Sequence, residues 1–176
     1  MPVIFVCGVH GVGKTTFCQK LSKRLNIPYF TASALIREKS AQVISDKAGD
    51  KRVKNIENNQ ILLVEAVHSK LSIYDKIILD GHATIIDQDG NCQSLPEDVF
   101  QKLGIASILL VKNSVSEIAR RLLLRDGISP DPEFIRSHQN SEMQQAMLLA
   151  DRLKIRFYAL DGSEEALRKI VEDRSI

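Results

Sequence analysis

The chain has 176 residues, of which 44% are hydrophobic and 26% charged, and its formal net charge is +2. This length suits one domain with a sizeable core, and the interspersed acids and bases argue against a basic surface for nucleic acid or membrane. No apolar stretch is as long as a membrane span, and the first residues lack the basic lead and cleavage site of a secretory signal. The three cysteines, Cys7, Cys18 and Cys92, show no C-x-x-C spacing. They predict reduced thiols in a cytoplasmic protein, with Cys7 and Cys18 as small core residues.

Apolar runs and apolar repeats alternate along the chain. Short apolar runs bounded by turn residues predict strands at residues 3–7, 27–30, 76–80, 106–111 and 155–160. Repeats of helical period predict one helix that opens at Ser33 as N-cap, and others at residues 14–25, 56–73, 96–104, 114–126, 132–153 and 163–173. Residues 41–54 are polar, and we expect mostly loop there. Residues 81–96 are expected to form a long connection with a turn at Asp89-Gly90.

This alternation predicts an α/β fold, with a central parallel sheet of about five strands and helices on both of its faces. The strand at residues 76–80 is short and almost uniformly apolar, so we place it centrally. No repeat or linker interrupts the chain, and residues 1–176 are expected to form a single domain. Ligands of such sheets bind beyond the carboxyl ends of the strands, where both the glycine-rich loop and Asp80 should lie.

The glycine-rich loop follows the first strand. Gly8, Gly13, Lys14 and Thr15 match the P-loop pattern G-x-x-x-x-G-K-[ST], with a strand before it and a helix after it. The glycines allow backbone amides to point at phosphate oxygens, and the helix start adds partial positive charge. The predicted nucleotide-binding residues are Gly8, Gly11, Val12, Gly13, Lys14, Thr15 and Thr16.

The same pattern predicts a divalent metal. Lys14 should reach the β- and γ-phosphates of ATP, while the hydroxyl of Thr15 is placed to ligate Mg²⁺. Asp80 ends an apolar strand at the same edge, and its carboxylate should hold the ion through a water. The sequence therefore predicts a site for Mg²⁺ and ATP.

Later segments resemble nucleoside monophosphate kinases. "IPYFTASALIREKS" resembles the S-T-G-D-M-L-R segment of adenylate kinases, which implies that Arg37 binds the phosphate of the acceptor. "ILDGHATIIDQDGNCQSLP" resembles the D-T-H-S-T segment of archaeal-type adenylate kinases. "EIARRLLLRD" and "IRSHQNSEMQQAMLLA" resemble the helices that enter and leave the lid of these enzymes. The resemblance implies a P-loop kinase-type three-layer fold, an acceptor-binding segment at about 31–73 and a short lid at about 125–133.

Arginines are expected around the transferred phosphoryl group. Arg121 and Arg125 lie one helical turn apart on one face, and Arg136 follows across the short lid loop. Phosphoryl transfer spreads negative charge over the γ-phosphate oxygens, and arginines stabilise that charge. We expect these arginines to be catalytic, together with Lys14 and Asp80.

The chain also departs from the family pattern. D-G-H-A-T replaces the D-G-F-P-R of familiar adenylate kinases, whose arginine gives a second contact to the acceptor phosphate. Ala34 and Met143 stand where the family has an aspartate and an arginine. The lid loop is too short to bind zinc. These departures favour membership of the superfamily over adenylate kinase itself.

The sequence favours an ATP- and Mg²⁺-dependent kinase of nucleoside monophosphates, with no nucleic acid or membrane as partner. His82, on the same edge of the sheet, either contacts the acceptor or the nucleotide or merely packs there. Asn58 and Gln60 are candidates to read a base. One alternative is a kinase with a hydroxyl acceptor, whose proton Asp80, Asp87 or Asp89 would accept. The other is an ATPase or nucleotide switch regulated by a partner protein.

Overall fold

The computed structural model describes residues 2–46, 56–86, 92–127, 130–173 and 176. Five strands form one sheet in the order β2-β3-β1-β6-β7, and every neighbouring pair is parallel. The strands are β1 (Val3–Cys7), β2 (Tyr29–Thr31), β3 (Ile77–Asp80), β6 (Ile105–Val111) and β7 (Arg156–Leu160). The prediction of a central parallel sheet is confirmed, and β3 lies inside it with all of its residues buried.

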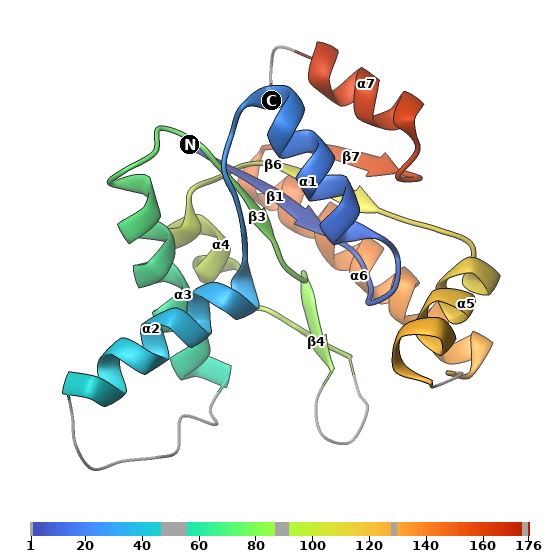
Figure 1. Cartoon of the computed structure of the whole chain (residues 1–176), viewed down its shortest axis with the longest axis horizontal. Coiled ribbons are helices and arrows are strands. Elements are labelled where there is room, and N and C mark those ends of the chain that lie inside the picture. Colours follow the sequence, from blue (N-terminus) through green and yellow to red (C-terminus); the bar gives the residue numbers. More distant parts are fainter. Residues whose placement is uncertain (1, 47–55, 87–91, 128–129, 174–175) are drawn as a thin grey trace.

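Helices cover both faces of this sheet (Figure 1). They are α1 (Lys14–Leu25), α2 (Ala32–Asp46), α3 (Ile56–Leu71), α4 (Glu97–Leu103), α5 (Val115–Asp126), α6 (Pro132–Leu153) and α7 (Glu164–Glu172). Ile4 and Val6 of β1 pack on the face that α1 and α7 cover. Val3, Phe5 and Cys7 point to the opposite face, which α3, α4 and α6 cover. This alternation along β1 gives the predicted three-layer fold its two apolar cores.

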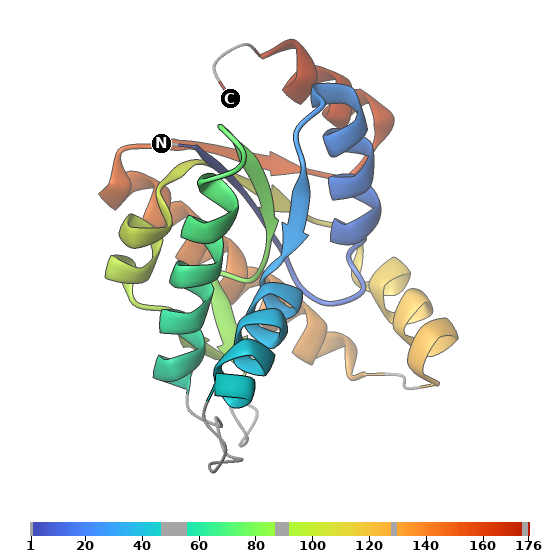
Figure 2. The same ribbon diagram turned by 60° about the vertical axis from the view of Figure 1, so that its left-hand side comes forward.

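The first part of α2 differs from the prediction. The hydroxyl of Thr31 accepts a hydrogen bond from the amide of Ala34 at 3.2 Å, so Thr31 caps the helix and Ser33 lies within its first turn. The helix continues to Asp46, so the predicted loop was wrong for residues 41–46. Figure 2 shows α2 and α3 side by side, as does Figure 1, and Leu35 is buried in the same core as Leu63. Packing against α3 therefore stabilises α2 as a helix, although apolar residues recur only weakly at helical spacing in its sequence.

The long connection after β3 contains a hairpin that the sequence did not predict. β4 (Thr84–Ile86) pairs antiparallel with β5 (Cys92–Ser94), and the hairpin extends beyond the edge of the main sheet (Figure 1). These strands are three residues long, too short for an alternating pattern to identify them. The predicted turn at Asp89-Gly90, together with Asp87, lies outside the described residues.

Two further expectations concern the cysteines and the membrane. Cys7 and Cys18 are buried core residues, as predicted, while Cys92 is exposed. Across the described residues, no helix combines the length and the apolar character that a bilayer span needs.

Candidate active site

The P-loop lies between β1 and α1, at the carboxyl edge of the sheet. Gly8 has a φ of 138°, and a Cβ atom there would lie 2.5 Å from the carbonyl oxygen of Val111. Gly13 has a φ of 106° and is the N-cap of α1. Both positions therefore require glycine for backbone conformation, and Gly8 requires it for space as well.

Lys14 is held inside the loop. Its ammonium group donates to the carbonyl oxygens of Gly8 at 2.6 Å and Val9 at 3.3 Å, and only 8% of the residue is exposed. Burial lowers the pKa of Lys14, and the carboxylates of Asp80 and Glu142 oppose that shift. The ammonium group thus lies within the P-loop and faces the cavity, where phosphates would bind.

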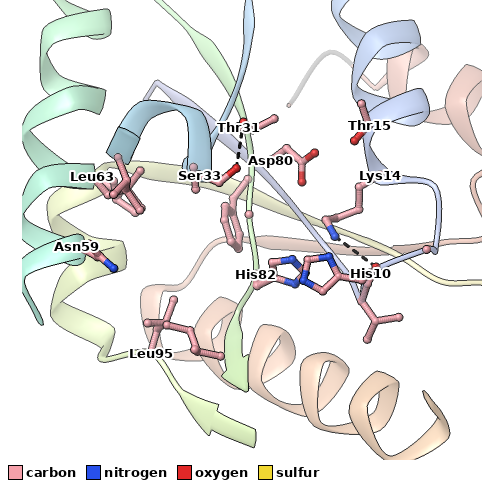
Figure 3. Close-up of a pocket in the computed structure, with 18 of the residues that line it drawn as sticks. His10, Lys14, Thr15, Thr31, Ser33, Asn59, Leu63, Asp80, His82 and Leu95 are labelled. Carbon is pink, nitrogen blue, oxygen red and sulfur yellow. Dashed lines mark hydrogen bonds between the residues drawn. The ribbon is translucent and has the colours of Figure 1, made fainter. Parts of the chain in front are cut away.

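Thr15 and Asp80 offer oxygen atoms beside this lysine (Figure 3). Burial raises the pKa of Asp80, while Lys14 and a hydrogen bond to Thr15 lower it. Within the described ranges, no group of three or more metal-ligating side chains occurs. A hydroxyl and a carboxylate nevertheless suit Mg²⁺, which commonly takes one or two protein oxygens and completes its shell with phosphates and water. The predicted Mg²⁺ residues therefore fit the ion.

A single cavity of about 770 Å³ joins the P-loop to a second chamber. The P-loop half is lined by Val9, His10, Gly11, Gly13, Lys14, Thr15, Thr16, Asp80, Arg121 and Arg125. The second chamber lies between α2, α3 and α4, and its apolar lining is Phe5, Ala32, Ile36, Leu63, Ile85, Leu95, Val99, Phe100 and Leu103. The predicted P-loop residues Gly8 and Val12 do not line the cavity; they act through their carbonyl groups, which accept hydrogen bonds from Lys14 and Arg121.

Neutral polar side chains complete the second chamber. Thr31, Ser33, Asn59 and Gln60 all line it. Asn59 takes the place that we predicted for Asn58, which is exposed and absent from the lining. The rotation of α3 about its own axis decides whether Asn58 or Asn59 points into the chamber. That rotation is fixed by how the helix packs, and the two residues are of the same type.

Two of the predicted lid arginines reach the cavity. Arg121 donates to the carbonyl oxygen of Val12 at 2.8 Å and to Glu117 at 2.7 Å, so it joins α5 to the P-loop. Arg125 also lines the cavity, while its guanidinium group binds Asp126 at 2.7 and 2.6 Å. Arg136 is exposed, pairs with Glu133 and does not line the cavity.

The two predicted acceptor residues, Arg37 from the resemblance and His82 from its place at the sheet edge, differ in position. Arg37 is exposed on α2, outside the lining, one turn beyond Ser33. His82 lines the cavity, and its ring lies 4.5 Å from that of His10 (Figure 3). Burial, Lys14 and the two other histidines nearby lower the pKa of His82 to about 2. The imidazole of His82 is therefore neutral at physiological pH.

Glu142 is a residue of this region that the sequence did not identify. It lies on the inward face of α6 with 0% exposure. Its Oε1 atom accepts from the amides of Gly8 at 3.1 Å and Ala83 at 2.8 Å, and Oε2 accepts from the amide of Thr84 at 2.9 Å and from its hydroxyl. The available signal was a glutamate at helical spacing from His138 and Ala146, both buried on the same face of α6.

Comparison with known proteins agrees with this geometry. The sequence profile described as "AAA domain" (AAA_17) matches residues 7–136. An adenylate kinase of Pyrococcus abyssi (strain GE5 / Orsay) is 27% identical over 183 residues, which is 97% of this chain and 93% of that protein. A shikimate kinase of Dictyoglomus turgidum is 26% identical over 126 residues, covering 68% of this chain and 70% of that protein.

Among solved structures, a gluconokinase from Sinorhizobium meliloti 1021 shares the fold. Its TM-score is 0.54 at 17% identity, with 97% of this chain and 89% of that chain covered. The profile spans most of the chain, from the end of β1 to the start of α6, and so includes the P-loop, Asp80 and the lid arginines. The chain therefore belongs to the AAA_17 family of AAA domains, within the P-loop kinases whose motifs its sequence carries.

Proposed function

We propose that this P-loop kinase transfers the γ-phosphoryl group of Mg²⁺-ATP to a small acceptor. The observation that carries the proposal is the single cavity in which the P-loop, Asp80 and two lid arginines open directly onto a second chamber. Its volume of about 770 Å³ lies in the range of small-molecule sites. A protein that only hydrolysed ATP would need no such chamber.

Each residue has a proposed role. The amides of the P-loop and Lys14 bind the triphosphate, and Thr15 and Asp80 hold Mg²⁺, which would neutralise charge on the phosphates. Arg121 and Arg125 stabilise the transferring group, and Arg136 would join them when the lid closes and excludes water. We also propose that the protein works in the cytoplasm, since its cysteines are unpaired.

A nucleoside monophosphate is the first candidate acceptor. The apolar chamber suits a base, and the amides of Asn59 and Gln60 can pair with its edge. Arg37 lies on the same face of α2 as Ser33, which lines the chamber, so Arg37 is the proposed contact for an acceptor phosphate. Resemblance to adenylate kinase over almost the whole chain also favours this candidate.

An uncharged alcohol is the second candidate. Among the described residues that line the second chamber there is no lysine or arginine. The carboxylate of Asp80 lines the same cavity and would be the candidate to accept the proton of a hydroxyl acceptor.

Matched acceptors separate these possibilities. Release of ADP should be measured with each nucleoside and its 5′-monophosphate, and with small uncharged alcohols. We expect a monophosphate to raise ADP release and to yield a diphosphate. Faster release of ADP with a nucleoside or another alcohol than with any monophosphate would select the second candidate. Slow hydrolysis that no acceptor changes would reject the kinase and favour the partner-regulated ATPase.

A further inference from the structure

Glu142 connects two parts of the cavity wall that are distant in sequence. Through Oε1 it binds Gly8, the first residue of the P-loop, and through both oxygens it binds Ala83 and Thr84, which follow Asp80 in the chain. Glu142 does not line the cavity itself. Any influence on substrates must therefore pass through the segments that it holds.

Donor groups surround the carboxylate of Glu142. Among the described residues, the groups within hydrogen-bond distance are three backbone amides, which can only donate, and the hydroxyl of Thr84. A buried carboxylate is costly unless several donors satisfy it, and here they come from both segments. The charge is thus stable only while both segments keep their places.

The two segments carry the reacting groups. The carbonyl oxygen of Gly8 binds the ammonium group of Lys14 at 2.6 Å, so a hydrogen-bonded chain runs from Glu142 through Gly8 to Lys14. On the other side, Ala83 directly follows His82, whose Nδ1 atom lies 3.8 Å from Oε1 of Glu142. Glu142 therefore adds a side-chain link between the P-loop and the stretch after Asp80, beyond the last backbone pairing of β1 with β3.

We propose that Glu142 is a positioning residue that holds the nucleotide half and the acceptor half of the site in register. This inference rests on the proposed function, because it concerns the same cavity. Phosphoryl transfer depends mainly on the placement of the reacting groups. A displacement of about 1 Å can slow such a reaction by about a hundredfold.

Three variants test the proposal. Glu142→Gln keeps the size of the side chain but turns an NH₂ group toward backbone amides, so it should release both segments. Thr84→Val removes only the bond from the hydroxyl and leaves Gly8 in place. Glu165→Gln is the charge-matched control, because Glu165 is exposed on α7 and pairs only with Lys169 among the described residues.

Nucleotide affinity and turnover are the functional readouts. For Glu142→Gln we expect the Kd for Mg²⁺-AMPPNP to rise about tenfold, and kcat to fall about a hundredfold. Thr84→Val should lower kcat about tenfold with little change in Kd, since the bond to Gly8 remains. Glu165→Gln should change neither. Amide exchange measured by NMR should accelerate at Gly8, Ala83 and Thr84 in Glu142→Gln.

Three results would overturn the proposal: unchanged Kd and kcat in Glu142→Gln, a loss confined to its melting temperature, or unchanged exchange at those amides. Failure of the proposed function looks different. A wild-type protein that binds Mg²⁺-AMPPNP but phosphorylates no acceptor would reject the kinase, whereas Kd and amide exchange would still decide the role of Glu142. If Glu142→Gln does not fold, Thr84→Val carries the test.

Discussion

Individual charges in this site are placed by the backbone as much as by other side chains. Lys14 binds two P-loop carbonyl groups, and Glu142 binds three backbone amides. A group held by the backbone keeps its position whatever the neighbouring side chains do, which suits a site that must accept a highly charged nucleotide. The geometry of the loop, more than its composition, therefore gives Lys14 its place.

Lys14→Ala should abolish phosphoryl transfer and leave the fold intact. The ammonium group supplies a charge at the phosphates, and loss of such a group typically slows transfer by about 10³-fold or more. ADP release in the presence of an acceptor measures the effect, and far-ultraviolet circular dichroism checks the fold. A fully active Lys14→Ala enzyme would contradict the assignment of the P-loop.

His138 should make stability depend on pH. Burial lowers the pKa of His138 from the ordinary 6.5, Glu142 opposes that shift and Lys14 adds to it. Below pH 6.5 the unfolded chain therefore binds a proton that the folded chain does not, so the stabilisation by neutral His138 is lost as the pH falls. We expect His138→Leu to lose less free energy of unfolding than the wild type between pH 7 and pH 5. Urea titrations at both pH values measure the free energy of unfolding. An equal loss in the wild type and in His138→Leu would refute the prediction.

At the scale of elements, hydrogen bonds anchor α5 and α6, the helices on either side of the predicted lid. Arg121 joins α5 to the P-loop through Val12. Gln139 of α6 exchanges two hydrogen bonds with the backbone of Asn113, which lies between β6 and α5. The bases of these two helices are thus fastened by hydrogen bonds to the P-loop and to the segment after β6.

Arg125→Ala should lower kcat by about 10²–10³-fold while the Kd for Mg²⁺-ATP stays nearly constant. The reason is that Arg125 pairs with Asp126 in this structure and would meet the γ-phosphate only during transfer. Arg120→Ala is the matched control, because Arg120 lies on the same helix, is exposed and binds Glu117. Steady-state kinetics measure kcat, and calorimetry measures the Kd for Mg²⁺-ATP. An equal loss in both variants would show that Arg125 has no specific role.

The whole molecule is organised about β1. This strand pairs with β3 on one side and β6 on the other, and its residues contribute to both apolar cores. The P-loop begins where this strand ends, so the binding site is attached to a strand that is buried at every residue. Separate unfolding of one half of the sheet would expose that strand to water.

We therefore predict one cooperative unfolding transition, which Mg²⁺-AMPPNP shifts upward. A ligand at about one hundred times its Kd stabilises a protein by about 2.7 kcal/mol, which for a chain of this size raises Tm by roughly 5–10 °C. Scanning calorimetry measures both the number of unfolding transitions and the shift in Tm. Lys14→Ala should show a smaller shift, and two separate transitions would contradict the single domain that the sequence predicts.

Local sequence patterns were sufficient to predict much of the secondary structure and the P-loop of this protein. The P-loop is a contiguous motif, and the six residues from Gly8 to Gly13 must adopt one backbone path to present their amides. The helix predicted at residues 132–153 is confirmed at both ends, because Asp131 caps it, Pro132 opens it and Lys154 closes it in the left-handed conformation. The central place of β3 followed from its apolar composition.

Long-range contacts decided the rest. Glu142 is hydrogen-bonded to Gly8, 134 positions away in the sequence, and to Ala83, 59 positions away. No local sequence pattern predicts such contacts. The choice of Asn59 over Asn58, and the exposure of Arg37 and Arg136, depend on how whole helices are rotated and packed. Short-range sequence determines where helices, strands and phosphate-binding loops form, because those depend on neighbouring residues. Which side chains share the cavity was decided only by the tertiary structure, because packing alone fixes the orientation of each element about its axis.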